Sequence, residues 1–469
     1  MPDVVLTVAE VAAATGGRLV RADPHAAVAS VVTDSRQVRP GALFAALAGP
    51  HHDGHAFVAD AARRGAVAAV VSRPVEVDVA QVVVDDVLAC LLPLAAAWIA
   101  RFDVRAVGVT GSTGKTTTVR MIESVLQRAA PTHASQPNWN AEVGVPLTVF
   151  GLRRDHRYLV VEMAMRGAGQ IAQLCRAVRP AVGVVTNVGE SHLALLGSIE
   201  AIARAKAELV DALPPDGAAV LNADDPRVAA MDVRCRGRVV RYGLATAADV
   251  HATDVRIDAE GCRFRLAAGA DTAAVHLPVP GQHFVSNALA AAAVGVVEGV
   301  SVGAIADALS GFRPPPGRLQ LRRLGGDVVV CDDTYNASPA SLRAALETAR
   351  ALRGGRRLVA VLGEMRELGP RADAAHQEAG ALCAAEGVDA LVVVGELGSR
   401  IAQGARAAGM RSGAIHASAD AADAARLAAE LVRDGDLVLV KGSRAVGLER
   451  VVAGLASARS SAAVPTEGR

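Results

Sequence analysis

Short apolar runs rich in valine and alanine alternate with longer amphipathic stretches along most of this chain. A strand buried on both faces reads as a continuous apolar run, whereas a helix that covers a sheet repeats its apolar positions every three to four residues. The stretches between the runs are too long for hairpins, which favours parallel strands joined by helices. The pattern therefore predicts an α/β fold.

The alternation falls into three blocks, and we expect each block to be a domain. Residues 1–84 are predicted to form a small α/β domain, and residues 85–313 a central domain with a mostly parallel sheet. Within the second block, residues 233–279 read as shorter alternating strands, typical of an antiparallel flank. The predicted strands of these two blocks are Val28–Val32, Val67–Val71, Val82–Val84, Val107–Thr110, Tyr158–Glu162 and Ala181–Val188.

A proline-rich stretch separates the third block from the second. Three consecutive prolines, Pro314, Pro315 and Pro316, cannot continue a helix and favour an extended linker. A third strand and helix series follows in residues 314–456, and the small and polar residues 457–469 are predicted to be disordered. The predicted strands of this block are Val328–Cys331, Leu358–Leu362, Ala390–Val394 and Leu437–Val440.

Composition narrows the class of protein. The net charge is +1 and aromatic residues make up 3%, which argues against nucleic acid as a partner. The six cysteines lie far apart without a Cys-x-x-Cys pair, as expected of reduced thiols in a cytoplasm. The most apolar stretch, Val87–Ala100, is short and contains Pro93, so we expect a soluble cytoplasmic protein without a membrane span.

Lysine is rare in this chain, which makes its positions informative. Only Lys115, Lys206 and Lys441 occur among 49 basic residues. Lysine is a compact charge on a flexible stem and can give up its proton, which arginine cannot do. We therefore expect these lysines to occupy positions at which arginine could not replace them.

Lys115 follows a glycine-rich loop, Gly111-Ser112-Thr113-Gly114-Lys115-Thr116-Thr117. A strand pattern precedes the loop and an amphipathic stretch, Thr117–Arg128, follows it, which is the context of a phosphate-binding P-loop. The match is partial, because Val109 stands where the template has its first glycine. Backbone N–H groups at such a helix start bind phosphates, and Thr116 would offer its hydroxyl to Mg²⁺.

Two further polar residues follow predicted strands of the same sheet. Glu162 closes one strand and His192 comes after the next. Because carboxyl ends of parallel strands meet at one edge, these side chains are candidates for a Mg²⁺ site beside the loop. A competing pattern, Gly167–Ala172, fits a dinucleotide-binding turn, but four residues separate it from the end of the strand.

The motifs together resemble the Mur ligases, ATP-dependent amide-forming enzymes of peptidoglycan precursor synthesis, over nearly the whole chain. The chain is most similar to the member that joins D-Ala-D-Ala to a UDP-N-acetylmuramoyl tripeptide. Besides the loop, the motifs are Thr33–Arg36, Pro40–Phe44, Asp53–His55, Leu221–Pro226, Gly281–His283, Asn287-Ala288, Asp332–Pro339, Leu362–Gly369 and Val440–Arg444.

This resemblance implies an N-terminal domain for the UDP-sugar, a central P-loop ATPase domain and a C-terminal Rossmann-like domain in a monomer. It also implies that ATP phosphorylates the terminal carboxylate of the tripeptide and that the dipeptide amine attacks the acyl phosphate. A carboxylate is a poor electrophile, and phosphorylation gives it a good leaving group.

The resemblance also implies roles for individual residues. Lys115 would contact the phosphates, Thr116 and Glu162 one Mg²⁺, and His192 and Lys206 a second metal, with Lys206 carbamylated by CO₂. Only a neutral amine adds CO₂, and lysine reaches that state far more readily than arginine. The implied nucleotide contacts are Gly111, Ser112, Thr113, Gly114, Thr117, Asn287, Arg318, Asp333, Tyr335 and Asn336, and the implied substrate contacts are Ser35, Arg36, Asn140, Lys441 and Ser443.

The chain departs from the family pattern at one loop, and alternatives stay open. Members commonly carry asparagine where Ala141 stands, which puts a substrate contact in doubt. Lys206 would otherwise be a solvated helix lysine, and Lys441 an ordinary surface lysine. A Mur-like ligase for another amino acid or carboxylate, or a catalytically silent nucleotide-binding subunit, are the competing functions. The sequence does not distinguish lysine, diaminopimelate and ornithine as the third residue of the tripeptide.

Overall fold

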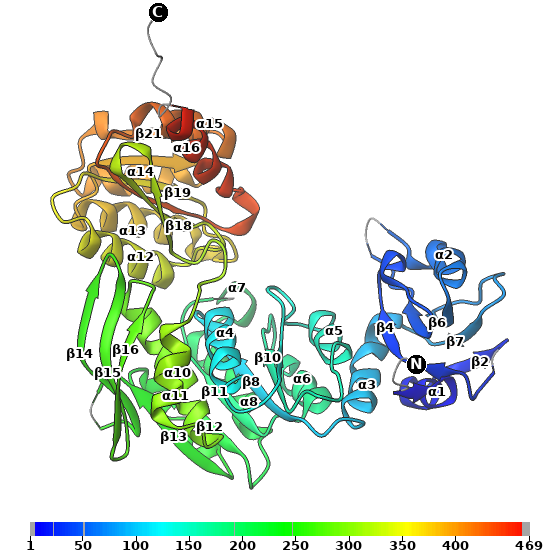
Figure 1. The fold of residues 1–469 in the computed structure, drawn as a ribbon. Coiled ribbons are helices and arrows are strands. Elements are labelled where there is room, and N and C mark those ends of the chain that lie inside the picture. Colours follow the sequence, from blue (N-terminus) through cyan, green and yellow to red (C-terminus); the bar gives the residue numbers. More distant parts are fainter. Residues whose placement is uncertain (1–4, 22, 50–51, 192, 246, 462–469) are drawn as a thin grey trace, which may run out of the picture.

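The computed structural model describes residues 5–21, 23–49, 52–191, 193–245 and 247–461 (Figure 1). Its architecture is α/β, as predicted, with separate sheets in the N-terminal, central and C-terminal parts of the chain. The described part contains no helix that is both long and apolar enough to cross a membrane. All six cysteines are free thiols, as expected.

The N-terminal part is built on a five-stranded sheet in the order β2-β7-β6-β5-β4. Its strands are β2 (Arg18–Val20), β4 (Ser30–Val32), β5 (Ala42–Ala45), β6 (Ala66–Val71) and β7 (Ala80–Val83), with a small pair of β1 (Leu6–Thr7) and β3 (Ala27–Val28) beside it. The helices are α1 (Val8–Thr15) and α2 (Val58–Arg63), with short turns η1 (Ser35–Gln37) and η2 (Gly54–Phe57). Helix α3 (Val87–Ile99) then leads to the central part, and its apolar side chains share one core with both.

The central part carries a nine-stranded sheet in the order β16-β15-β14-β13-β12-β11-β8-β10-β9. Its strands are β8 (Arg105–Thr110), β9 (Thr132–Ala134), β10 (Tyr158–Glu162), β11 (Val182–Val185), β12 (Ala218–Asn222), β13 (Arg238–Gly243), β14 (Val250–Asp258), β15 (Gly261–Ala268) and β16 (Asp271–Leu277). Its helices are α4 (Lys115–Leu126), α5 (Gly144–Phe150), α6 (Gln170–Val178), α7 (Leu193–Leu196), α8 (Ile199–Asp211), α9 (Pro226–Ala229), η3 (Asp232–Arg234), α10 (Gln282–Val297) and α11 (Val302–Ser310).

Alternating side chains of the central strands explain why helices cover both faces of the sheet. Val160 packs in the core that contains α4 and α10, whereas its neighbours Leu159 and Val161 pack in the core that contains α6 and α8. The predicted antiparallel flank exists in β14, β15 and β16. Strand β13 is different: it pairs in parallel with β12, because α9 and η3 return the chain to the opposite edge before it starts.

The C-terminal part has a six-stranded sheet in the order β17-β18-β22-β19-β20-β21, parallel except for the edge strand β17. Its strands are β17 (Gln320–Leu324), β18 (Val328–Asp333), β19 (Leu358–Gly363), β20 (Ala390–Val394), β21 (Ile415–Ser418) and β22 (Leu437–Lys441). Its helices are α12 (Pro339–Leu352), α13 (Ala372–Ala385), α14 (Gly398–Ala407), α15 (Ala421–Leu431) and α16 (Glu449–Ser461), with short turns η4 (Gly325–Asp327), η5 (Gly369–Arg371), η6 (Ser412–Ala414) and η7 (Arg444–Val446).

The last helix extends further than the sequence pattern predicts. Helix α16 continues to Ser461, into the stretch expected to be disordered. Arg459 holds its end to the domain by bonds to the carboxylate of Asp434 and the carbonyl of Val432. Small and polar composition alone did not reveal this long-range anchor.

Candidate active site

A cavity of about 890 Å³ lies between the central and C-terminal sheets. Its walls come from residues at or just after the carboxyl ends of strands: Ser112, Glu162 and Asn187 from the central sheet, and Asp333 and Lys441 from the C-terminal sheet. This is the edge at which α/β sheets bind ligands. Two facing strand edges therefore form one site.

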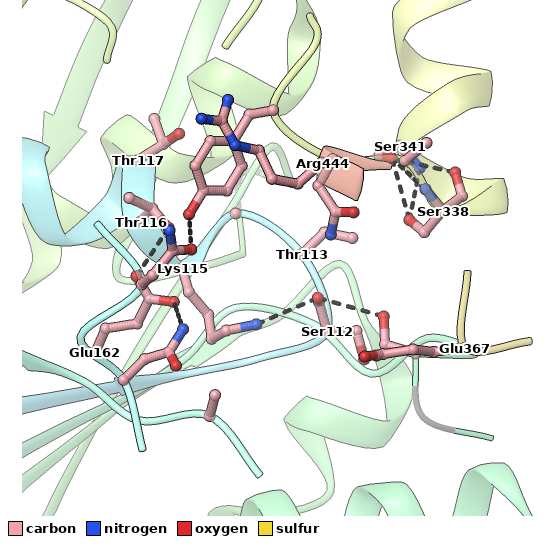
Figure 2. A pocket seen from close by; sticks show the side chains of 18 of the residues that line it. Ser112, Thr113, Lys115, Thr116, Thr117, Glu162, Ser338, Ser341, Glu367 and Arg444 are labelled. Atoms are coloured by element: carbon pink, nitrogen blue, oxygen red, sulfur yellow. Dashed lines mark hydrogen bonds between the residues drawn. The ribbon is translucent and has the colours of Figure 1, made fainter. Parts of the chain in front are cut away.

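The glycine-rich loop joins β8 to α4, as the sequence predicts. The ammonium of Lys115 donates to the carbonyl of Gly111 at 2.8 Å and to that of Ser112 at 3.4 Å, so the side chain folds back along the loop (Figure 2). Burial lowers the pKa of Lys115, and the charge of Glu162 acts in the opposite direction. The loop thus presents a helix N-terminus and a buried cation to the cavity.

Two glycines allow the loop to pack closely against Thr186, after β11, and Asn287, in α10. At Gly111, where φ is +151°, an added Cβ would lie 1.8 Å from Oγ1 of Thr186, and at Gly114, with φ +82°, one would lie 2.5 Å from Oδ1 of Asn287. Val109, at the missing first glycine of the template, lies inside β8 and is fully buried. The tight turn therefore begins at Gly111, which accounts for the partial match.

Asn187 was not among the predicted site residues, although it shapes the loop. Its Oδ1 accepts a 2.9 Å hydrogen bond from the backbone N–H of Thr113, and its amide donates to the Thr113 carbonyl at 3.1 Å. The hydroxyl of Thr186 donates to that same carbonyl at 2.7 Å. The predicted strand Ala181–Val188 includes Asn187, so the sequence pattern did not show that this residue follows the end of β11, the strand next to β8.

Glu162 is buried beside the loop and is held by three groups. The hydroxyl of Thr116 donates to Oε2 at 2.8 Å, the amide of Asn140 donates to Oε1 at 2.9 Å, and the Glu162 backbone N–H donates to Oγ of Ser135 at 3.1 Å. Arg318 donates to the Thr116 hydroxyl at 3.3 Å from the inter-domain linker. Figure 2 shows Thr116 and Glu162 directed toward each other.

Lys206 lies in α8 with only 2% of its surface exposed, so it is not a solvated helix lysine. Burial lowers its pKa well below the ordinary value, and the charge of Lys115 lowers it further. Two of the three lysines of the chain are therefore electrostatic neighbours. His192, the other candidate for the second metal, lies outside the described residues.

The competing dinucleotide pattern does not form a free anion site. The carboxylate of Glu208 accepts hydrogen bonds from the backbone N–H groups of Gly169 at 2.6 Å and Ala172 at 3.0 Å. These are amides at the start of α6 that a pyrophosphate would need. Their use by Glu208 explains why this turn is structural.

The donors near the loop fit a divalent cation. In the part of the chain that the structure describes, no three His, Cys, Asp or Glu side chains gather to hold a metal ion. Thr116 and Glu162 nevertheless place a hydroxyl and a carboxylate 2.8 Å apart. Mg²⁺ bound with a nucleotide uses one or two such protein oxygens, and phosphates and water supply the rest.

The C-terminal wall is organised by Lys441, which is 2% exposed and therefore not an ordinary surface lysine. Its ammonium donates to Oδ2 of Asp333 at 2.6 Å and to the carbonyl of Asn336 at 2.9 Å. Oγ of Ser443 accepts the backbone N–H of Arg366 at 3.0 Å. Both predicted residues line the cavity, and each also fixes a loop of the wall.

Arg318 and Tyr335 stack at the boundary between the two sheets. The guanidinium carbon of Arg318 lies 3.8 Å from the centre of the Tyr335 ring, and the Tyr335 hydroxyl donates to Asn138 of the central part. Burial raises the pKa of Tyr335. Asn287 also lines the cavity, and its Oδ1 accepts a hydrogen bond from Thr118 at 3.3 Å.

Ser35 and Arg36 do not reach the cavity. Ser35 is buried in the N-terminal part, and Arg36 pairs with Asp34 at 2.7 Å on its surface. Figure 1 shows the N-terminal sheet at the far end of the molecule from the C-terminal sheet. Asn140, by contrast, lies in the cavity wall.

Three charged residues of the C-terminal wall were not predicted individually: Arg366, Glu367 and Arg444. Glu367 has a φ of +67°, a left-handed conformation that is rare for a non-glycine residue and common at functional sites. Its charge raises the pKa of Lys115. Arg366 and Glu367 lie within the motif Leu362–Gly369, but no single residue of that motif was assigned a role from the sequence.

Comparison with known proteins gives a consistent result. Residues 27–106 match the Mur ligase family catalytic domain, 109–295 the Mur ligase middle domain and 317–444 the Mur ligase glutamate ligase domain. A UDP-N-acetylmuramoyl-tripeptide--D-alanyl-D-alanine ligase from Synechocystis is 39% identical over 91% of both chains.

Solved structures agree over similar lengths. A crystal structure of MurF from Acinetobacter baumannii is 31% identical and has a TM-score of 0.88, covering 97% of this chain and 100% of its own. The MurF ligase from Thermotoga maritima, in complex with ADP, is 30% identical with a TM-score of 0.82, covering 92% of this chain and 98% of its own. The chain belongs to the Mur ligase family.

Proposed function

We propose that this protein uses ATP to join D-alanyl-D-alanine to the carboxylate that ends a UDP-N-acetylmuramoyl tripeptide. The observation that carries the proposal is the cavity, in which the P-loop and Glu162 face the C-terminal wall built by Asp333 and Lys441. The names of relatives that match over nearly the whole chain support the choice of substrates.

The reaction needs two transfers. The tripeptide carboxylate attacks the γ-phosphate of ATP, which gives an acyl phosphate and ADP. The amine of D-Ala-D-Ala then attacks the acyl carbon, loses a proton, and expels phosphate. Catalysis consists mainly of holding the groups in line and neutralising phosphate charge. The loop amides of residues 111–116 and the ammonium of Lys115 would supply that neutralisation.

Thr116 and Glu162 would hold a Mg²⁺ ion against the phosphates. When bound, the ion neutralises charge that develops on the transferred phosphoryl group. Asn140 fixes the second oxygen of Glu162, and this leaves Oε2 and the Thr116 hydroxyl on the cavity side. Arg318 would meet the phosphates from the linker, since it already reaches Thr116.

Lys206 and His192 would serve a second metal, with Lys206 as a carbamate. Addition of CO₂ to the neutral amine forms an N–C bond, releases one proton and replaces a cation by an anionic oxygen ligand. The burial of Lys206 supports this assignment, because an ammonium there is costly. Its neighbour Lys115 would balance the new negative charge.

Nucleoside contacts are proposed for Asn287, Asp333, Tyr335 and Asn336, all of which line the cavity. Ser35 and Arg36 are proposed for the distant UDP end of the substrate. We also propose the domain limits 1–84, 85–313 and 314–456, and action as a cytoplasmic monomer. The free cysteines support a reducing compartment.

An assay of phosphate release tests the proposal. The reaction should require ATP, Mg²⁺, a UDP-N-acetylmuramoyl tripeptide and D-Ala-D-Ala together. Turnover with single amino acids in place of the dipeptide would indicate a different ligase. ATP binding without phosphate release in the presence of any of these carboxylate substrates would indicate a catalytically silent subunit.

A further inference from the structure

A second, smaller cavity of about 230 Å³ adjoins the main one. Leu92 of α3 and two residues of α6, Gln173 and Leu174, line its outer part. Ala141, Glu142, Ala164 and Gln170 line both cavities. We call this space the Ala141 pocket. Pockets for whole small molecules are larger, at about 300 Å³ or more, so its size suits one side chain.

The Ala141 pocket opens close to Glu162. Ala164 comes two residues after Glu162, and its backbone N–H donates to the carbonyl of Asn140 at 2.8 Å. The amide of Asn140 in turn donates to Glu162 at 2.9 Å. The hydrogen bonds thus tie the mouth of the pocket to the carboxylate beside the P-loop. A substrate carboxylate bound beside the P-loop would therefore place its own side chain near the mouth of this pocket.

The walls of the pocket differ in chemical character. Leu92, Leu174, Ala141 and Ala164 offer apolar surface, of which Leu174 is nearly fully buried. Glu142 is exposed and is the one charged residue among the described residues that line the pocket. Oε1 of Gln170 accepts hydrogen bonds from the backbone N–H groups of Arg166 and Gly167, which holds this side chain in the wall of the pocket. An aliphatic chain with a cationic end matches this arrangement.

Resting on the proposed function, we propose that the Ala141 pocket receives the side chain of the third residue of the tripeptide. It selects a long aliphatic side chain that ends in an ammonium group. The methylenes lie against the leucines and alanines, and the ammonium faces Glu142. The small side chain of Ala141 leaves the mouth of the pocket open.

Each part of this contact has an expected size. Removing one buried methylene weakens binding by about fourfold, from about 0.8 kcal/mol per methylene. An exposed ion pair contributes about fivefold at most. Loss of one methylene and loss of the charge should therefore have effects of similar size, and both effects should be measurable.

The test compares kcat/KM for UDP-N-acetylmuramoyl tripeptides that differ only in the third residue. We expect lysine to be used best, ornithine about fourfold less well, and norleucine up to about fivefold less well than lysine. Alanine should fall by 10-fold or more. Equal kcat/KM values for lysine and alanine, or a preference for norleucine or diaminopimelate over lysine, would overturn the assignment.

Variants localise the effect. Glu142→Gln should abolish the difference between lysine and norleucine, and Ala141→Asn should lower kcat/KM for the lysine tripeptide more than kcat/KM for the alanine tripeptide. Glu430→Gln, an exposed change in α15, is the matched control. An Ala141→Asn enzyme that keeps the full preference for lysine would contradict the placement.

The outcomes separate this inference from the function on which it rests. Absence of phosphate release with every tripeptide would overturn the proposed function together with the pocket assignment. Release at equal efficiency with every tripeptide would overturn the pocket assignment alone.

Discussion

The hydroxyl of Thr116 and the carboxylate of Glu162, 46 residues apart in the sequence, form a 2.8 Å hydrogen bond in which the hydroxyl donates. Both oxygens belong to the proposed magnesium site. Glu162→Gln keeps the shape of the side chain and removes its charge, and it should lower kcat by about 10²-fold or more. The dependence of phosphate release on MgCl₂ concentration should also change, because Mg²⁺ binds more weakly at this site without the Glu162 charge. An unchanged magnesium dependence would contradict the assignment.

Lys206 provides the second prediction. Lys206→Ala should abolish phosphate release while the protein still binds ADP, because the loop around Lys115 is intact. Short carboxylates such as formate or acetate should restore part of the activity by replacing the carbamate. Labelling with ¹³CO₂ should give a carbamate signal in the parent protein and none in the variant. Normal turnover by Lys206→Ala without added carboxylate would exclude the carbamate.

Gly111 should not tolerate a side chain. A Cβ at this position would meet Oγ1 of Thr186 at 1.8 Å, so Gly111→Ala should displace the loop. We expect a loss of ADP affinity of 10-fold or more and a destabilisation of about 1–3 kcal/mol. Calorimetry and thermal unfolding measure the two effects. Gly167→Ala is the matched control, because nothing lies within 4 Å of its added Cβ.

The buried pair of Lys441 and Asp333 should show strong coupling. Lys441→Met leaves the Asp333 carboxylate without its partner and should lower the free energy of unfolding by about 3–5 kcal/mol. The double variant Lys441→Met with Asp333→Leu should recover much of this loss, since no unpaired charge remains. Urea unfolding of the parent protein, the two single variants and the double variant gives the free energies of unfolding for this double-mutant cycle. Additive losses in the two single variants would show that the pair is not coupled.

His283 should make stability depend on pH. Burial lowers its pKa to about 4. Between pH 6.5 and 4 the unfolded chain binds a proton at this residue and the folded chain does not, so stability falls as the pH falls through this window. His283→Gln should flatten that part of the profile of stability against pH, measured by urea unfolding. A profile unchanged by the substitution would assign the pH dependence to other groups.

The features that the sequence predicted correctly are those encoded by contiguous residues. Strands such as β8 and β10 are continuous apolar runs, and the P-loop is a contiguous motif, so both were predictable. The direction of β13 depends on how the preceding connection crosses the sheet. The role of Asn187 depends on contacts with Thr113 across 74 residues. Such long-range contacts leave little trace in a single sequence.

The lysines show what amino-acid composition can predict about a site and what it cannot. Rarity singled out Lys206 and Lys441, and both are buried. Composition did not show that Lys441 pairs with Asp333, because that bond joins β22 to β18 across the sheet. Ser35 and Arg36 are further examples, since their distance from the cavity depends on the arrangement of whole domains.

Arg318 connects the central and C-terminal parts of the molecule at the proposed phosphate site. It lies in the connection between the central and C-terminal sheets, and it touches Thr116 on one side and Tyr335 on the other. A rotation of the C-terminal sheet relative to the central sheet would therefore move this guanidinium away from the proposed phosphate site. Nucleotide binding would then be coupled to the orientation of the C-terminal sheet. A second ligand that favours one orientation would change nucleotide affinity by the same factor by which the nucleotide changes the affinity for that ligand.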